Sequence, residues 1–272
     1  MKNLLLTARN IIALSLIGIA ATLLSQAVVK LCGGVDAEVR MVIAATALML
    51  IMIVGVAIYD KMVAGVKQKT MLRFAGFDPV VQLWGVLLLV SISIVLAPLM
   101  RLLPDVNPNL PDSVIPILYV VVVAPILEEV LFRAKIFSVL RSTMMPSGAA
   151  LLSALMFGVM HGSVAVGIEA FFAGIVFSYI YMLKGSLFAP ILLHMMNNIM
   201  AYVIMSFSYQ DRTIEDYIGD LPMFSTIYIV AAVIVLCGAV HVVVTLRKAN
   251  KIVMDGGDLK ELSKPQRRSS IR

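Results

Sequence analysis

The chain has 272 residues, of which 61% are hydrophobic and only 14% are charged. Soluble domains average roughly 45–50% apolar and about 25% charged residues. This chain therefore has too little polar surface to face water, and its solvent must be largely lipid. The formal net charge of +6 could indicate nucleic-acid binding, but the basic residues gather between apolar runs and in the C-terminal tail. Membrane topology places Lys and Arg there, which excludes nucleic acid and leaves the lipid bilayer as partner.

Eight apolar stretches are candidates for membrane-spanning helices, each of which needs about 20 mostly apolar residues. They cover approximately residues 11–29, 40–59, 80–102, 114–133, 147–166, 168–183, 186–208 and 223–246. The boundary between the fifth and the sixth is the weakest, because only Gly162 to Gly167 separates them. No ten-residue alternating pattern recurs, as barrel strands would require. The sequence predicts an all-α polytopic membrane protein with about eight transmembrane helices.

The segments between these stretches alternate in charge. Basic residues gather near the N-terminus, in 60–79, in 134–146 and in the tail 247–272, whereas 104–113 and 211–220 are acidic. Because Lys and Arg mark the cytoplasmic side, both termini are predicted to be cytoplasmic. We expect an integral protein of a bacterial cytoplasmic membrane. The basic loop 60–79 also carries apolar residues, a mixture typical of an interfacial amphipathic helix.

Ionisable residues inside the apolar stretches are functional candidates, because a charge in mid-membrane costs about 2.5–3.5 kcal/mol on insertion scales. The first cluster is Glu128 and Glu129, followed by Arg133. Glu129 and Arg133 are four residues apart and can pair on one helix face. Glu128 points about 100° away and has no local basic partner, which suits a general base. The alternative is a helix end whose charges only mark the membrane interface.

Two further polar clusters lie in later apolar stretches. His161 follows Phe157 by four residues, and His194 precedes Asn198 by four, so that each pair shares a helix face. Either histidine alone could be a packing residue, and either cluster could hold helices together through hydrogen bonds. The three clusters would converge on one cavity if the helices around 114–133, 147–166 and 186–208 are neighbours.

Together the three clusters resemble the CAAX-protease and bacteriocin-processing family, which includes the Ras-converting CAAX endopeptidases. That family is marked by EExxxR, FxxxH and HxxxN on successive membrane helices. The motifs read here as Glu128-Glu129-x-x-x-Arg133, Phe157-x-x-x-His161 and His194-x-x-x-Asn198. Each motif is short, but all three in order make a fairly specific match over about residues 112–205.

The resemblance implies an eight-helix membrane endopeptidase with a cavity open to the cytosol. It would hydrolyse a peptide bond in a membrane-associated substrate, such as a lipidated protein or a leader or signal peptide. Glu128 would activate the hydrolytic water and His161 would orient it. His194 and Asn198 would stabilise the oxyanion of the tetrahedral intermediate.

The resemblance also implies a supporting ion pair between Glu129 and Arg133. Members of the family are often described as metalloproteases. Glu128, His161 and His194 could form a zinc site with an open fourth position, or they could act without metal through a glutamate-activated water. Both alternatives stay open, and no cofactor is assigned.

On this basis the chain divides into four parts. Residues 1–111 hold the first three helices and the basic loop, and 112–208 form the protease-like core. Residues 209–246 contain an outer loop and the last helix, and 247–272 form a basic cytoplasmic tail.

Two alternative functions use the same residues. The chain could be a non-proteolytic scaffold or regulator of a partner membrane protein, with the polar clusters as structural glue. It could also be a transporter with Glu128 and Glu129 as a proton relay, but we find no paired repeats. Glu169 and His241 match no motif and are interpreted as interfacial or packing residues. Substrate identity and oligomeric state stay open.

Overall fold

The protein is helical throughout the part that the computed structural model describes. The described residues are 2–65, 77–103, 113–208 and 221–263, and they contain no strand. Seven of their helices are long and apolar enough to cross a membrane. The all-α class is thus confirmed, and the chain is an integral membrane protein. Most of the predicted amphipathic segment 60–79 lies outside the described residues, as do most of both acidic loops and the end of the tail.

The first helices are α1 (Lys2–Leu31), α2 (Ala37–Tyr59) with the π-helical turn η1 (Asp60–Ala64), and α3 (Pro79–Met100). One continuous helix, Val114–Arg141, follows; we call it the glutamate helix. It is built from α4 (Val114–Leu118), η2 (Tyr119–Val123), α5 (Ala124–Glu129), η3 (Val130–Ile136) and α6 (Phe137–Arg141). The remaining elements are α7 (Pro146–Val159), α8 (Val164–Lys184), α9 (Phe188–Ser208), α11 (Leu221–Met254) and the short 3-10 turn η4 (Leu259–Glu261).

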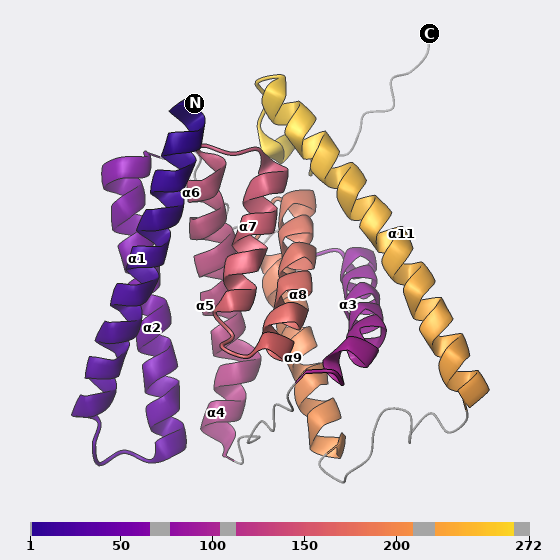
Figure 1. Ribbon diagram of the computed structural model, residues 1–272, viewed down its shortest axis with the longest axis horizontal. Helices are drawn as coiled ribbons and strands as arrows, with labels where there is room; N and C mark the ends of the chain where they lie inside the picture. Colours follow the sequence, from indigo (N-terminus) through magenta and orange to yellow (C-terminus); the bar gives the residue numbers. More distant parts are fainter. Residues whose placement is uncertain (1, 66–76, 104–112, 209–220, 264–272) are drawn as a thin grey trace.

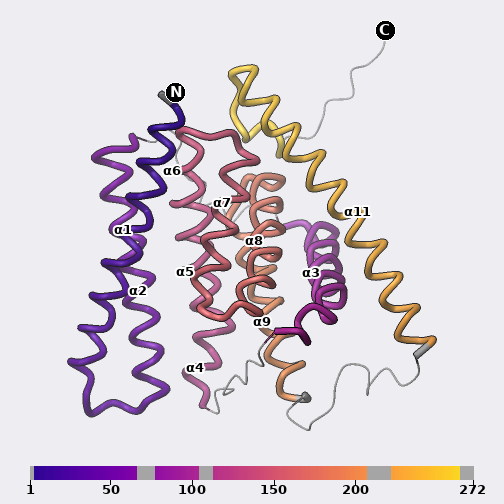
Figure 2. Tube along the Cα trace, viewed as in Figure 1, coloured from indigo at the N-terminus to yellow at the C-terminus, as the bar shows by residue number. Residues whose placement is uncertain are grey.

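The helices form a bundle with the α1–α2 hairpin on one flank and α3 with α11 on the other (Figure 1). The glutamate helix, α7, α8 and α9 lie between these flanks, as the trace in Figure 2 also shows. Helix α7 packs along α8, and α9 contacts α8, α3 and the glutamate helix. The start of α1 and the end of α11 lie at the same end of the bundle in Figure 1. Their cytoplasmic placement stays a prediction.

Polar contacts fix α3 against the helices of the centre. Asp78 caps the N-terminus of α3 and forms an ion pair with Lys184 at the end of α8, with 2.9 Å between Oδ2 and Nζ. The hydrogen bond from Lys184 lowers the pKa of Asp78. One turn further, Gln82 Nε2 donates to the Ala189 carbonyl over 2.9 Å. Helix α3 is thereby held beside α8 and α9, where it can form one wall of a site.

The helix expected over 147–166 is shorter than predicted. Helix α7 ends at Val159 after 14 residues, a length of about 21 Å, and α8 begins at Val164. Gly162 in the intervening turn has φ +71°, a left-handed conformation that stops a helix and that glycine adopts readily. His161 therefore lies in a turn and not in a helix, and the eight expected spans become seven candidate spans and one short apolar helix.

Two glycines allow the close approach of α7 and α8 at this turn. A Cβ atom on Gly158 would lie 2.5 Å from the Gly167 carbonyl oxygen, and one on Gly167 would lie 2.9 Å from the Gly158 oxygen. Both obstacles are backbone atoms, so a side chain at either position would push the helices apart. The turn that carries His161 thus depends on the absence of a side chain at Gly158 of α7 and at Gly167 of α8.

We predict that Gly158→Ala lowers the free energy of unfolding by about 1–3 kcal/mol, the usual cost of overpacking a tight contact. Thermal unfolding in detergent micelles measures the change. Gly18→Ala is a matched helical control, because its Cβ would meet only a methionine methyl at 3.7 Å. Equal stability of the Gly158 variant and wild type would contradict the account of this contact.

Candidate active site

The glutamate helix has an irregular backbone on both sides of its acidic pair. In the π-helical turn η2 the Ala124 N–H bonds to the Tyr119 carbonyl, five residues back. The next acceptor in that register, the Val120 carbonyl, would need the N–H of Pro125, which proline lacks. The Val120 carbonyl is therefore available to a side chain, and π-helical turns of this kind are frequent at functional sites.

The expected ion pair between Glu129 and Arg133 lies in the centre of the protein. Arg133 Nη1 is 2.7 Å from Glu129 Oε1, and both side chains are completely buried. Arg133 also donates from Nη2 to the Gly174 carbonyl of α8 over 3.1 Å. The guanidinium lies 4.8 Å from the ring centroid of Phe157 and 5.2 Å from that of Phe177. These contacts neutralise the charge and join the glutamate helix to α7 and α8.

His194 of α9 connects the two adjacent glutamates. Its Nδ1 lies 3.0 Å from Glu129 Oε1, and its Nε2 lies 3.6 Å from Glu128 Oε2. Because a carboxylate only accepts hydrogen bonds, the Nδ1 atom carries a proton and Nε2 faces Glu128. The ring is stacked on Phe177, with 4.7 Å between centroids. Glu129 thus orients the imidazole, and the opposite nitrogen is directed at the second carboxylate.

His161 is fixed in one tautomer by its own turn. Its Nδ1 lies 2.8 Å from the Phe157 carbonyl oxygen. Since a carbonyl accepts, Nδ1 carries the proton and the Nε2 lone pair is free to accept from water or another donor. The Phe157 ring packs edge-on against both His161 and His194. Phe157 therefore fixes the tautomer of His161 through its carbonyl, and its ring contacts both histidines.

Asn198 forms a hydrogen bond with the Val120 carbonyl, which has no backbone donor because Pro125 lacks an N–H. Its Nδ2 donates to the Val120 carbonyl over 2.9 Å, which joins α9 to η2 and fixes the orientation of the amide. Asn197 donates to Asn198 Oδ1 over 3.4 Å. The Asn198 amide has one further N–H, and any contact with a substrate must use that hydrogen.

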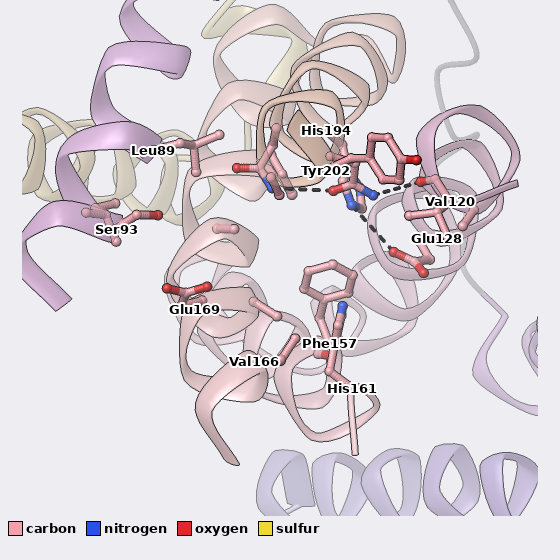
Figure 3. Close-up of a pocket in the computed structure, with 18 of the residues that line it drawn as sticks. Leu89, Ser93, Val120, Glu128, Phe157, His161, Val166, Glu169, His194 and Tyr202 are labelled. Atoms are coloured by element: carbon pink, nitrogen blue, oxygen red, sulfur yellow. Dashed lines mark hydrogen bonds and ion pairs between the residues drawn. The ribbon is translucent and has the colours of Figure 1, made fainter. Parts of the chain in front are cut away.

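Glu128, His161, His194 and Asn198 all line one cavity of about 440 Å³. Figure 3 shows Glu128 and His161 on one side of it, with His194 and Tyr202 nearby. Glu129 and Arg133 are not among the lining residues, and they support the site from behind. The four residues with expected catalytic roles thus come together, while the roles themselves remain predictions.

Glu169 and His241, which belong to no motif, differ in their position relative to the cavity. Glu169 lines the same cavity, although the sequence suggested only an interfacial or packing position. An acidic residue in an apolar stretch was the available signal, but its direction depends on how α8 packs. His241 lies outside the cavity and its Nδ1 is 2.9 Å from the Tyr179 hydroxyl, consistent with packing of α11 on α8.

The described residues form no ready zinc site, and zinc as a cofactor stays a prediction. No group of three or more His, Cys, Asp or Glu side chains among them is placed to hold a metal ion. Glu128, His161 and His194 line one cavity without forming such a group. We therefore derive no catalytic step through a metal.

Comparison with known families supports the interpretation of the three motifs. Residues 110–200 match the family described as Rce1-like, type II CAAX prenyl endopeptidase Rce1-like. This segment is similar to the Rce1-like family. The Rce1-like segment contains Glu128, Arg133, His161, His194 and Asn198, so the resemblance drawn from the motifs is confirmed. Comparisons with curated proteins and with solved structures gave no match.

We predict that Arg133→Met in the Rce1-like segment lowers the free energy of unfolding by about 3–5 kcal/mol, because it leaves the Glu129 charge buried without a partner. The double variant Glu129→Gln, Arg133→Met should recover most of this loss, since neither charge remains. Thermal unfolding in detergent micelles measures both. Arg247→Met, at an exposed position, is the control and should change stability by no more than about 0.5 kcal/mol. A double variant as unstable as the single one would refute this role.

Proposed function

We propose that the chain is an intramembrane endopeptidase that uses a glutamate-activated water. The observation that carries the proposal is the common cavity of Glu128, His161, His194 and Asn198. General base, orienting groups and oxyanion donors must all reach one reacting carbonyl, and a shared cavity meets that geometric condition. The match of residues 110–200 to a family of endopeptidases supports the same reaction class.

In the proposed reaction Glu128 removes a proton from a water molecule as the water oxygen attacks the scissile carbonyl carbon. The tetrahedral intermediate carries the negative charge on the former carbonyl oxygen. Its collapse breaks the C–N bond, and Glu128 returns the proton to the leaving amine. The 15% exposure of the Glu128 side chain leaves it accessible from the cavity. Glu129 cannot replace it, because that side chain is fully buried and bonded to Arg133 and His194.

The neighbouring side chains would position the reactants. His161 Nε2 accepts a hydrogen bond from the attacking water, since Nδ1–H is bonded to the Phe157 carbonyl. His194, which Glu129 orients through Nδ1, stabilises the oxyanion. Asn198 contributes its remaining N–H. The proposed role of each side chain thus depends on which of its atoms already forms a hydrogen bond within the protein.

The proposed substrate is a membrane-associated peptide or protein that enters the cavity from the bilayer or from its cytoplasmic face. A lipidated protein and a leader or signal peptide are the two classes considered. The proposed location is a bacterial cytoplasmic membrane, with the basic segments facing the cytosol.

We predict that Glu128→Gln abolishes processing, because the amide keeps the shape of the side chain but cannot accept the proton of water. Peptide mass mapping of membrane fractions from cells that express wild type or this variant measures the result. Peptides present only with wild type are the expected outcome. Identical peptide sets would refute the proposal, and with both proteins correctly folded they would favour the non-proteolytic scaffold.

For a peptide identified in this way, we predict that Asn198→Ala lowers kcat by about 10²–10³ with little change in KM, as for loss of one oxyanion donor. Purified protein in liposomes provides the kinetics, and thermal unfolding reports separately on the lost contact with Val120. A variant with wild-type kcat would show that Asn198 serves only to join α9 to η2.

A further inference from the structure

The cavity contains a second acidic side chain that the proposed reaction does not use. Glu169 lies on the face of α8 that also presents Ala170, Ala173 and Phe177 to the cavity. Phe177 stacks on His194, so this face of α8 extends to the proposed reaction centre. In Figure 3, Glu169 and Ser93 of α3 both lie on the opposite side of the cavity from Glu128. The two carboxylates thus lie on opposite walls of one space.

No protein cation neutralises Glu169 within the described part of the chain. Its carboxylate forms no hydrogen bond or ion pair with the described residues. Besides the two carboxylates, the titratable groups in the described lining are His161, His194, Tyr119 and Tyr202, and this lining includes no Lys or Arg. The buried cation Arg133 does not line the cavity and is bonded to Glu129.

An unpaired carboxylate in a membrane helix is costly, and such residues generally pair with another charge or mark the path of a substrate. Glu169 is exposed at the cavity, and most of the other side chains that line this cavity on α3, α8 and α9 are apolar. An anionic group would be repelled from this wall, whereas a cation would gain a charge-assisted hydrogen bond. The lining therefore discriminates by charge at a position separate from the scissile bond.

We propose that Glu169 is a specificity-determining residue that binds a positively charged side chain, Lys or Arg, of the peptide substrate. This inference rests on the proposed endopeptidase function and deepens it, because it names the chemistry of the substrate. The cationic side chain lies at a fixed number of residues from the bond that Glu128 attacks through water. Ser93 provides a hydroxyl at the same wall, where it can accept a further hydrogen bond from the cation.

The test uses full-length protein in liposomes and a library of acyl-anchored ten-residue peptides with randomised positions and one photoreactive residue. Mass spectrometry of cleaved peptides gives the residues around each cut. Wild type should enrich Lys and Arg about tenfold at one position, the effect of roughly 1.4 kcal/mol. Glu169→Gln should lose the enrichment, and Glu169→Lys should enrich Asp and Glu instead. Asp255→Asn, which removes the same charge at an exposed position outside the cavity, should behave as wild type.

Photo-crosslinking of the same library to the Glu128→Gln variant separates binding from chemistry. Captured peptides should be rich in Lys and Arg, and the double variant Glu128→Gln, Glu169→Gln should lose that preference. Absence of cleavage by wild type would overturn the proposed function, while the captured peptides would still decide the role of Glu169. No cationic preference in capture, or a preference unchanged by Glu169→Gln, would overturn this inference.

Discussion

The buried ion pair between Glu129 and Arg133 is the constraint on which the site depends. Both charges are fully removed from solvent, and desolvation makes either of them very unfavourable alone. The pair is therefore tolerated only with further partners, which are the Gly174 carbonyl, the faces of Phe157 and Phe177, and His194. These partners come from α7, α8 and α9. The partners that this buried pair requires thus determine how α7, α8 and α9 pack around the glutamate helix. They also fix the imidazole ring of His194, which faces Glu128.

Backbone irregularity is the second determinant of the site. Pro125 removes one N–H just before the glutamates, and the π-helical turn η2 leaves the Val120 carbonyl for Asn198. The glycine pair at positions 158 and 167 allows the closest approach of α7 and α8, and the left-handed Gly162 ends the short helix. His161 consequently lies in a turn at the cavity, where its tautomer is set by the Phe157 carbonyl. The polar groups are thus positioned by departures from regular helix geometry.

The sequence predicts those features that depend on contacts within one helix. Hydropathy identifies the apolar helices, and the i to i+4 spacing of Glu129 and Arg133 identifies their ion pair. Contacts between helices could not be derived in this way, because spacing does not reveal which helices are neighbours. The direction of Glu169, the bond from Asn198 to η2 and the end of α7 at Val159 all depend on packing. The sequence predicted that the three clusters meet in one cavity only because the order of the motifs resembles that of a known family.

The position of the ion pair within a single helix has a consequence for synthesis of the protein. Glu129 and Arg133 lie in the glutamate helix, so their charges can cancel before α8 and α9 have been made. A helix in which both charges were unpaired would enter lipid less readily, whereas the internal pair leaves Glu128 as the one carboxylate of this helix without a partner in the same helix. The partners that later surround Arg133 can then be added one helix at a time. The ion pair between Glu129 and Arg133 thus allows the glutamate helix to stay in the bilayer before the later helices have been synthesised.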